Sequence, residues 1–131
     1  LYTSRLATVA AIRGACPAGG CIIALCCDMR IMTNVGSIGL NEVLLGIPVP
    51  KYWAKVMAEV IGIRPSEDLL LTGRMPNAQQ AKSLCMVDLL VDSKEKLLEA
   101  ALEAARKLAK LPGHARAATK MSLRGDLAAL W

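Results

Sequence analysis

The sequence contains no phenylalanine, and tryptophan and tyrosine together make up only 3% of its 131 residues. A chain this poor in aromatic side chains lacks the stacking platforms with which many proteins bind single-stranded nucleic acid. It also lacks any apolar run approaching the roughly 18–20 residues of a membrane span. Hydrophobic residues nevertheless make up 54% of the sequence and charged residues 21%, which predicts a folded chain with a mainly aliphatic core.

Metal binding and thiol chemistry have little support in the sequence. No pair of cysteines has C-x-x-C spacing, and the single histidine, His114, is far from all of them in the sequence. A catalytic Cys–His pair would have to use His114, and no local pattern supports one. We expect no metal site, and we expect buried, reduced thiols typical of a reducing compartment at Cys16, Cys21, Cys26, Cys27 and Cys85.

Positive charge is concentrated toward the C-terminal end of the sequence. Residues 1–93 contain eight basic and seven acidic side chains, whereas residues 94–131 contain eight basic and four acidic ones. This excess indicates either a phosphate-bearing partner or a solvated helix face.

Short apolar segments alternate with helical patterns, which predicts an α/β fold. Strands are expected at residues 8–13, 28–33 and 87–91, and helices at residues 19–27, 53–61, 65–72 and 78–85. Asn77 and Gln80 have the spacing of a capping box, as do Asp92 and Glu95 before the longest helix. That helix is expected to end at Pro112-Gly113, with another after it, and its apolar stripe is Leu97, Leu98, Ala101, Leu102, Ala105, Leu108 and Ala109.

The glycine-rich segment GACPAGGC at residues 14–21 nearly matches a phosphate-binding loop. Gly20 replaces the lysine and Cys21 the hydroxyl residue of that loop, which makes a nucleoside triphosphatase improbable. Two glycines at a helix start instead predict free backbone N–H groups that attract negative charge, as in half of an oxyanion hole. Close packing of the helix on a strand is the alternative. Ser37 does not fit the G-x-S-x-G nucleophile motif.

Acidic residues are scarce at the beginning of the chain, because Asp28 and Glu42 are the only two among residues 1–58. Glu42 lies in the aliphatic segment IGLNEVLLGI. A carboxylate in such surroundings needs either a partner or a function, because burial disfavours its charged form. One hypothesis is that Glu42 is a general base, and the other is that it faces solvent from a short helix.

Three ordered motifs resemble the crotonase (enoyl-CoA hydratase/isomerase) superfamily: IRGACPAGGCIIALCCDMRIMT, IGLNEVLLGI and LTGRMPNAQQAKSLCMVDLLV. The resemblance implies an incomplete ClpP/crotonase-like spiral of ββα units with C-terminal helices. Residues 1–92 would form the central part of the spiral core, and residues 93–131 a truncated C-terminal helical region. Family members are longer, so we expect a fragment. Cys85 replaces a glycine that usually ends the helix in this family, and the connection at residues 33–37 is short for the isomerase branch of the family.

Single positions indicate a branch within this family. Hydratases of the family have a second glutamate directly after the cysteine of the oxyanion helix, where this sequence has Ile22. The G-L-N-E context of Glu42 resembles mitochondrial 3,2-trans-enoyl-CoA isomerases, whose reaction needs one base where hydration needs two groups. By resemblance, Glu42 and the Gly19 N–H are catalytic, and the substrate is bound by Asn41, Pro17, Ala18 and Leu40.

The resemblance also implies a substrate, an assembly and a location. The substrate would be a 3-enoyl-CoA formed in β-oxidation of unsaturated fatty acids, with coenzyme A as part of the substrate and no separate cofactor. The protein would be a homotrimer or hexamer in the mitochondrial matrix, or in peroxisomes, without a nucleic-acid partner. On this interpretation the basic C-terminal residues form a helix face that could contact CoA phosphates.

Two kinds of alternative remain at this point. The chain could belong to an enoyl-CoA hydratase or another crotonase-fold acyl-CoA enzyme. It could also belong to a non-catalytic family member that binds CoA or RNA.

Overall fold

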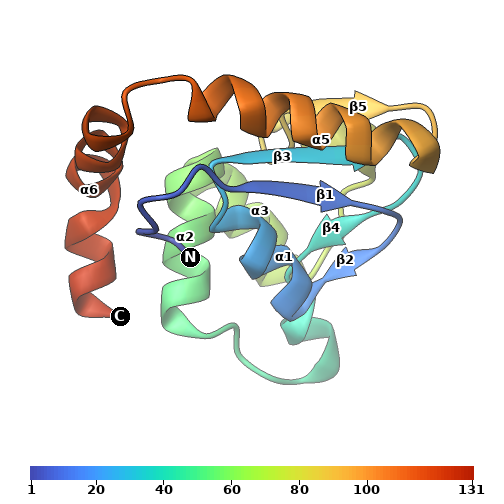
Figure 1. The fold of residues 1–131 in the computed structure, drawn as a ribbon. Coiled ribbons are helices and arrows are strands. Elements are labelled where there is room, and N and C mark those ends of the chain that lie inside the picture. The colour runs from blue at the N-terminus through green and yellow to red at the C-terminus, as the bar shows by residue number, and fades with distance from the viewer.

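Parallel strands and covering helices account for most of the chain in the computed structural model, which describes residues 1–131 (Figure 1). This confirms the predicted α/β class. Strands β1, β3 and β5 form one parallel sheet in that order, and β2 pairs with β4 in a second. The elements are β1 (Val9–Ile12), β2 (Cys16–Pro17), α1 (Ala18–Leu25), β3 (Met29–Thr33), β4 (Ile38–Gly39), the 3₁₀ helix η1 (Glu42–Leu45), α2 (Lys51–Ile61), α3 (Ile63–Thr72), α4 (Ala78–Ser83), β5 (Leu89–Val91), α5 (Lys94–Ala109) and α6 (Gly113–Leu130).

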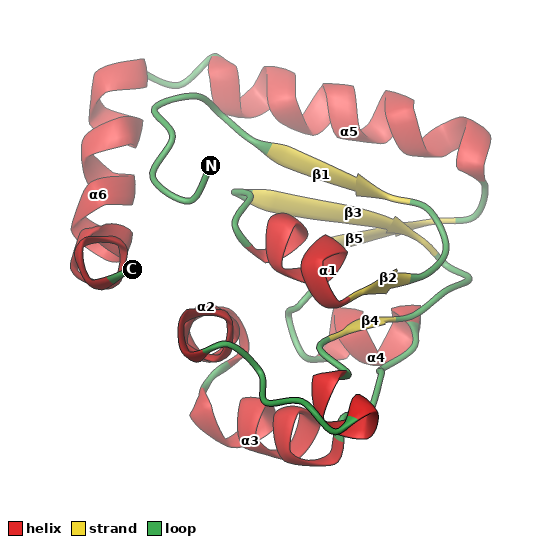
Figure 2. Cartoon of the chain, turned by 90° about the horizontal axis from the view of Figure 1, so that it is seen from below, coloured by secondary structure: helices red, strands yellow, loops and turns green.

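The central strand β3 is covered on both faces, by α5 on one side and α1 on the other (Figure 2). Ile31 packs with Leu97 and Ala101 of α5, whereas the next residue, Met32, belongs to the main core that includes α1. Successive side chains of a strand point to opposite faces, so this alternation follows from the strand geometry. Burial on both faces is reflected in the adjacent apolar residues Ile31 and Met32, which are both fully buried.

The two predicted capping boxes have different outcomes. At α4 the prediction is confirmed, because Asn77 Oδ1 accepts the Gln80 N–H at 2.9 Å and Gln80 Oε1 accepts the Asn77 N–H at 3.0 Å. At α5 the prediction is wrong, because Ser93 is the N-cap and its Oγ accepts the Lys96 N–H at 3.3 Å. Ser93 is the last extended residue before the helix, and Asp92 instead forms an ion pair with Lys96.

The apolar stripe of α5 is only partly buried. Leu97 and Ala101 face the sheet, whereas Leu98 and Leu102 are 63% and 44% exposed. A helix lying on a sheet buries a narrow strip, and the outer edge of a wide apolar stripe stays outside it. The helix ends at Ala109, before the predicted Pro112-Gly113. No helix combines the length and apolar character required to cross a bilayer.

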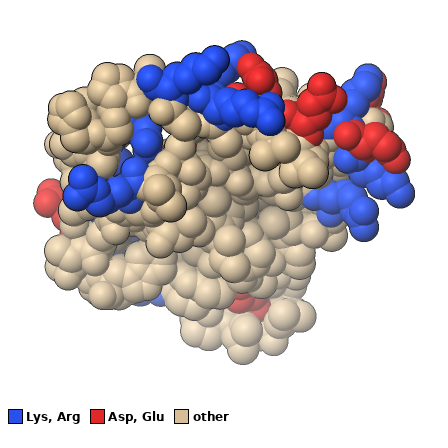
Figure 3. Space-filling view, viewed as in Figure 1, with Lys and Arg blue, Asp and Glu red and all other residues tan.

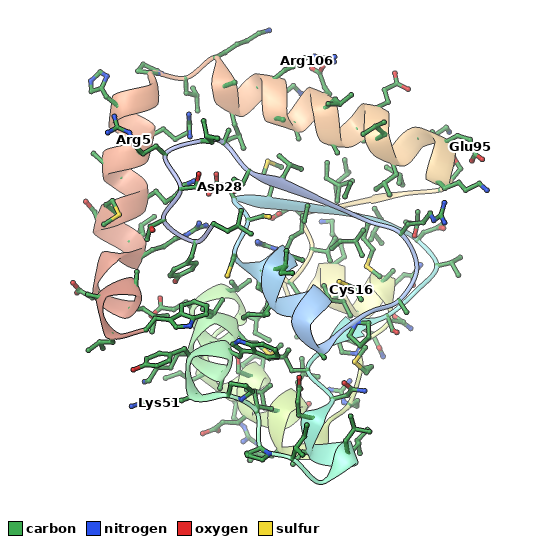
Figure 4. The ribbon with its side chains drawn as sticks, turned by 60° about the horizontal axis from the view of Figure 1, so that its bottom comes forward. Arg5, Cys16, Asp28, Lys51, Glu95 and Arg106 are labelled. Atoms are coloured by element: carbon green, nitrogen blue, oxygen red, sulfur yellow. The ribbon has the colours of Figure 1, made fainter.

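Asp28, just before β3, connects the strand layer to α6 (Figure 4). Its carboxylate accepts hydrogen bonds from Lys120 Nζ at 2.7 Å, from Arg124 Nη1 at 3.1 Å and from the Thr8 N–H at 2.9 Å. Burial raises the pKa of Asp28, but these hydrogen bonds and the two positive charges outweigh burial, so the pKa lies below its usual value. Lys120 also donates to two carbonyl oxygens, those of Ser4 and Leu6.

Another charged side chain, the buried Arg30 of β3, ties this strand to its neighbours. Its Nε donates to the Met86 carbonyl at 2.7 Å and its Nη1 to the Cys27 carbonyl at 2.9 Å. The Arg30 N–H donates to Asp88 at 2.8 Å. These bonds join the end of α1, the beginning of β3 and the segment that leads into β5.

The turn after α4 retains a left-handed backbone although a glycine is missing there. Cys85 has φ +62°, the conformation that the usual glycine would adopt more easily. The Cys85 N–H donates to the Lys82 carbonyl at 3.1 Å and the Met86 N–H to the Ala81 carbonyl at 2.9 Å, which close the helix. The substitution is therefore accommodated at the cost of backbone strain.

The short connection between β3 and β4 depends on a close approach of two glycines. A Cβ built on Gly36, at φ +143°, would overlap the backbone of Gly14. Around it, the Cys16 N–H donates to the Ser37 carbonyl at 2.8 Å and the Ala78 N–H donates to the Gly36 carbonyl at 3.1 Å. This packing determines where β4, and the residues after it, begin.

We predict that Gly36→Ala lowers the free energy of unfolding by at least about 3 kcal/mol, because it adds an overlap with backbone to an unfavourable φ. Gly46→Ala is the matched control, since Gly46 also has a positive φ of +75° but open space around its Cβ position. We expect the control to cost about 1 kcal/mol. Urea unfolding of the full chain measures both, and equal costs would contradict the role of the glycine contact.

We predict that Asp28→Asn destabilises the protein by about 3 kcal/mol near neutral pH, because it leaves Lys120 buried without its ionic partner. The contribution of Asp28 is present above its unfolded pKa of about 3.9 and is lost as the pH falls through the lowered folded value. Acid titration of the unfolding free energy should therefore show a loss below about pH 4 in the wild type that the variant lacks. Asp126→Asn, an exposed acid on α6, is the control; an equal loss in both variants would contradict the prediction.

Candidate functional site

The carboxylate of Glu42 is buried at the beginning of η1. The residue is 5% exposed, and no protein group lies within hydrogen-bond distance of either carboxylate oxygen. The hypothesis of a surface-facing glutamate is therefore wrong, while the expected short helix is present. A buried carboxylate without a partner is unfavourable for folding, so its presence indicates a role other than stability.

The backbone of η1 holds this glutamate in a single tight turn. The Asn41 carbonyl accepts the Leu44 N–H at 3.1 Å, and the Glu42 carbonyl accepts the Ile47 N–H at 3.2 Å. Gly46 ends the turn in the left-handed conformation, which glycine adopts without a steric penalty. Leu40 is fully buried in the main core and anchors the segment from the other side.

The beginning of α1 presents free backbone N–H groups. The first residues of a helix have no acceptor within it, and α1 has neither a side-chain cap nor an acidic residue in its first turn. Gly19 is the second residue of the helix. The N–H groups of this turn and the positive end of the helix dipole can therefore stabilise an oxygen that gains negative charge.

Ala18, the first residue of α1, has φ +49°. Ala18 and Cys85 are the two non-glycine residues of the chain with positive φ. The left-handed region is unfavourable for a residue with a Cβ, and such residues concentrate at functional sites. At this position the strained residue turns the chain directly from β2 into the helix.

Pairing of β2 with β4 brings the two parts of the site together. Cys16 is paired with Ile38 and Pro17 with Gly39, in parallel. The chain leaves β2 toward Gly19 and leaves β4 toward Glu42, so both residues follow the carboxyl ends of adjacent parallel strands. Figure 4 shows Cys16 beside the beginning of α1.

Residues of α1 and α2 complete the surroundings. A Cβ on Gly19 would lie 3.9 Å from the ring of Trp53, so α2 covers this turn of α1. Burial raises the pKa of the Cys21 thiol, and the charges of Cys16 and Glu42 add to the effect. Cys21 is therefore a neutral thiol beside the glutamate, not a nucleophile.

No second carboxylate accompanies Glu42 on α1. Ile22 is buried and lines a cavity of about 410 Å³ together with Tyr2, Ile23 and Trp131. Asp28, the other acid among residues 1–58, is held by Lys120 and Arg124. The structure thus offers one free carboxylate at the strand ends, and its arrangement suits a reaction in which a single group accepts and returns a proton.

The other predicted substrate-binding residues surround these two. Pro17 is exposed, Ala18 and Asn41 are half-buried, and Leu40 is part of the core. Their contacts with a substrate stay predictions. The sequence interpretation missed Trp53, although a chain with only two tryptophans offers a signal in each of them.

The structure also shows where the cysteines and His114 lie. All five cysteines are free. The expectation of buried thiols is confirmed at Cys21, Cys26 and Cys27 but wrong at Cys85, which is exposed, and Cys16 is half-buried. His114 is exposed in the first turn of α6. No group of three or more His, Cys, Asp or Glu side chains is positioned to hold a metal ion.

Comparison with known proteins adds an independent observation. Residues 1–128 match the family model described as Enoyl-CoA hydratase/isomerase. The chain is 40% identical to human Enoyl-CoA delta isomerase 1, mitochondrial, over 126 residues that cover 95% of this chain and 41% of that protein. It is 36% identical to a putative enoyl-CoA hydratase of Thermus thermophilus over 100 residues, which cover 76% of this chain and 39% of that protein.

The fold is similar to a solved structure of the same kind. The crystal structure of human mitochondrial delta3-delta2-enoyl-CoA isomerase matches with a TM-score of 0.94 and 39% identity, over 98% of this chain and 50% of that one. This confirms the crotonase-like fold that the sequence motifs implied. The chain spans half or less of the length of these relatives.

We predict that Glu42→Met raises the free energy of unfolding by about 1–3 kcal/mol, because it replaces two buried oxygens without partners by an apolar side chain of similar length. Glu99→Met, on the exposed side of α5, should change it by less than about 0.5 kcal/mol. Denaturant unfolding of the full chain measures both. Destabilisation by Glu42→Met would show that the carboxylate has a stabilising partner.

Proposed function

Since the chain belongs to the enoyl-CoA hydratase/isomerase family, we propose that it forms the catalytic part of a 3,2-trans-enoyl-CoA isomerase of fatty acid β-oxidation. The reaction would convert a 3-enoyl-CoA into trans-2-enoyl-CoA. The observation that supports this proposal most directly is the buried Glu42 carboxylate without a hydrogen-bond partner, which follows β4 as the uncapped α1 follows the adjacent strand β2.

The reaction is a proton shift between two carbons of the same substrate. Glu42 takes a proton from C2 of the 3-enoyl group, and the electron pair of the broken C–H bond delocalises over the diene and the thioester oxygen. The protonated Glu42 then returns the proton to C4, which leaves the double bond between C2 and C3. No net proton, electron or water molecule is consumed, so one carboxyl group is sufficient.

The negative charge of the intermediate requires stabilisation at the thioester oxygen. The Gly19 N–H, in the uncapped first turn of α1, is the donor that this chain offers. Removal of one such donor typically lowers the rate by about 100–1,000-fold. The helix dipole acts in the same direction, because the developing charge lies at its positive end.

The absence of a carboxylate at Ile22 favours isomerisation over hydration. Addition of water requires one group to activate the water and a second to supply a proton to the substrate. Ile22 is apolar and buried, and Asp28 is occupied by Lys120 and Arg124. Enoyl-CoA hydratase activity is therefore the second candidate, since relatives with hydratase names also match the chain.

The remaining features of the proposal follow from the relatives. The matching isomerases are named mitochondrial, which supports the mitochondrial matrix as the location. Coenzyme A would enter as part of the acyl-CoA substrate, without a separate cofactor. Assembly as a homotrimer or hexamer stays a prediction.

We predict that the full-length protein converts 3-hexenoyl-CoA into trans-2-hexenoyl-CoA and that Glu42→Gln lowers kcat by about 100–10,000-fold, because the amide cannot accept the proton. The KM should change little, since the side chain keeps its size. Glu99→Gln, on α5, is the matched control and should retain full activity. The measurement follows both substrate and products by chromatography.

Two results would contradict the proposal. Hydration of 2-hexenoyl-CoA at a rate comparable to isomerisation would favour the hydratase alternative. Isomerisation that is unaffected by Glu42→Gln would assign the base to another residue.

A further inference from the structure

The junction of the last two helices carries only positive charge. Residues 104–125, here called the α5–α6 corner, contain six basic side chains and no acidic one. Figure 3 shows basic side chains gathered over the end of α5 nearest α6, with acidic side chains following toward its other end. The family resemblance implies that this face contacts CoA phosphates, but the proton transfer proposed above uses none of its side chains.

Two of these six basic side chains form ion pairs within the fold, and the other four form none. Lys120 and Arg124 are bound to Asp28 and to backbone carbonyls. The other four are Arg106, Lys107, Lys110 and Arg116, and none of them forms an ion pair. Arg106, Lys107 and Lys110 are exposed, so their charges are available to a partner.

Arg116 occupies a special place among the available charges. Its Nη1 donates to the Arg5 carbonyl at 3.2 Å, which places the positive charge of Arg5 on the same side of the molecule. Its Nε is buried and has no acceptor. Arg116 is therefore turned partly toward the protein, and the exposed Arg106, Lys107 and Lys110 carry the charge that a partner can reach.

The corner also exposes large aliphatic side chains. Leu111, in the connection between the helices, is 52% exposed, and Leu123 of α6 is 74% exposed. Both line a cavity of about 430 Å³, whose other apolar walls are Leu108, Pro112 and Ala115. Its polar lining is Thr119, Arg116 and Asp28 with the two cations that Asp28 binds. The exposed Leu111 directly follows the exposed Lys110 in the chain, and this combination fits a partner that is itself both anionic and apolar.

The combination of exposed cations with exposed leucines separates two kinds of anionic partner, nucleic acid and lipid, that positive charge alone would not separate. Single-stranded nucleic acid is bound by cations together with aromatic side chains on which its bases stack, but residues 104–125 contain no Phe, Trp or Tyr. Exposed leucines have no counterpart on a phosphate backbone. The dipole of α5 explains cations in its last turn, such as Arg106 and Lys107, but not those of α6 or the exposed Leu111.

We propose that the α5–α6 corner binds the surface of a bilayer that contains anionic phospholipids. Lys107, Lys110 and Arg106 contact the headgroup phosphates, and Leu111 and Leu123 enter the apolar layer beneath the headgroups. Peripheral binding of this kind needs two signals, an electrostatic one and an apolar one, and the corner supplies both. The chain lies on the bilayer surface and does not cross it.

The test measures partition of the full-length protein onto vesicles of phosphatidylcholine alone and of phosphatidylcholine mixed with phosphatidylglycerol, by co-sedimentation. We expect binding only to the mixed vesicles, and less binding as the salt concentration rises. Lys107→Gln with Lys110→Gln should weaken it about 25-fold, since each charge near an anionic surface contributes about fivefold. Leu111→Asn should weaken it by about tenfold through loss of apolar burial.

The matched control neutralises two exposed lysines elsewhere, Lys51→Gln with Lys55→Gln on α2, far from Arg106 (Figure 4). We expect this control to bind like the wild type, and circular dichroism verifies that every variant is folded. Absence of binding to the mixed vesicles, or equal losses in the control and in the lysine pair of the corner, would overturn the proposal. Binding that Leu111→Asn leaves unchanged and that RNA competes away would also overturn it, because the surface would then recognise charge alone.

Discussion

Parallel pairing between β2 and β4 is the constraint on which the candidate site depends. Each strand has only two residues, yet their pairing determines that Gly19 and Glu42 follow the same ends of neighbouring strands. In the connection before β4, Gly36 lies so close to the backbone of Gly14 that a Cβ at Gly36 would overlap it. A short loop that cannot tolerate a Cβ thus positions a helix terminus and a carboxylate against each other.

Asp28 and Glu42, the two acidic residues among residues 1–58, have opposite environments. Asp28 accepts hydrogen bonds from two cations and one backbone N–H, so its charge contributes to the attachment of α6. Glu42 is more deeply buried than Asp28 but has no hydrogen-bond partner. A carboxylate that is already satisfied cannot exchange protons easily with a substrate, whereas one without partners can. The stability lost at Glu42 is consistent with a role in proton transfer.

The basic residues of the last two helices have two different environments. Lys120 and Arg124 of α6 neutralise Asp28 and bind carbonyls of the N-terminal segment. Arg106 and Lys107 of α5, and Lys110 after it, are exposed and form no ion pair. Net charge alone would have assigned all of them the same role, but burial separates those that hold the fold together from those that face solvent.

Features encoded within a few residues were predictable from the sequence. The capping box of α4, the strand β3 and the free N–H groups beginning α1 each depend on neighbours in the chain, and the prediction holds for the capping box and the strand. The choice between Asp92 and Ser93 as the N-cap of α5 was not predictable, because both residue types are good N-caps. The choice depends on which of the two is the last extended residue before the helix, and this is Ser93. The wide apolar stripe of α5 likewise could not reveal which of its sides would face the sheet.

The sequence by itself determined the family resemblance, the α/β class and the isolation of Glu42 among aliphatic residues. Only the tertiary structure decided that Glu42 lacks a partner while Asp28 has Lys120, because that partner lies 92 residues away in the chain. Local patterns act over a single helical turn or strand pair, whereas the environment of a charge is set by whichever segments fold against it. For this reason composition could point to two carboxylates, and only packing could distinguish the structural one from the free one.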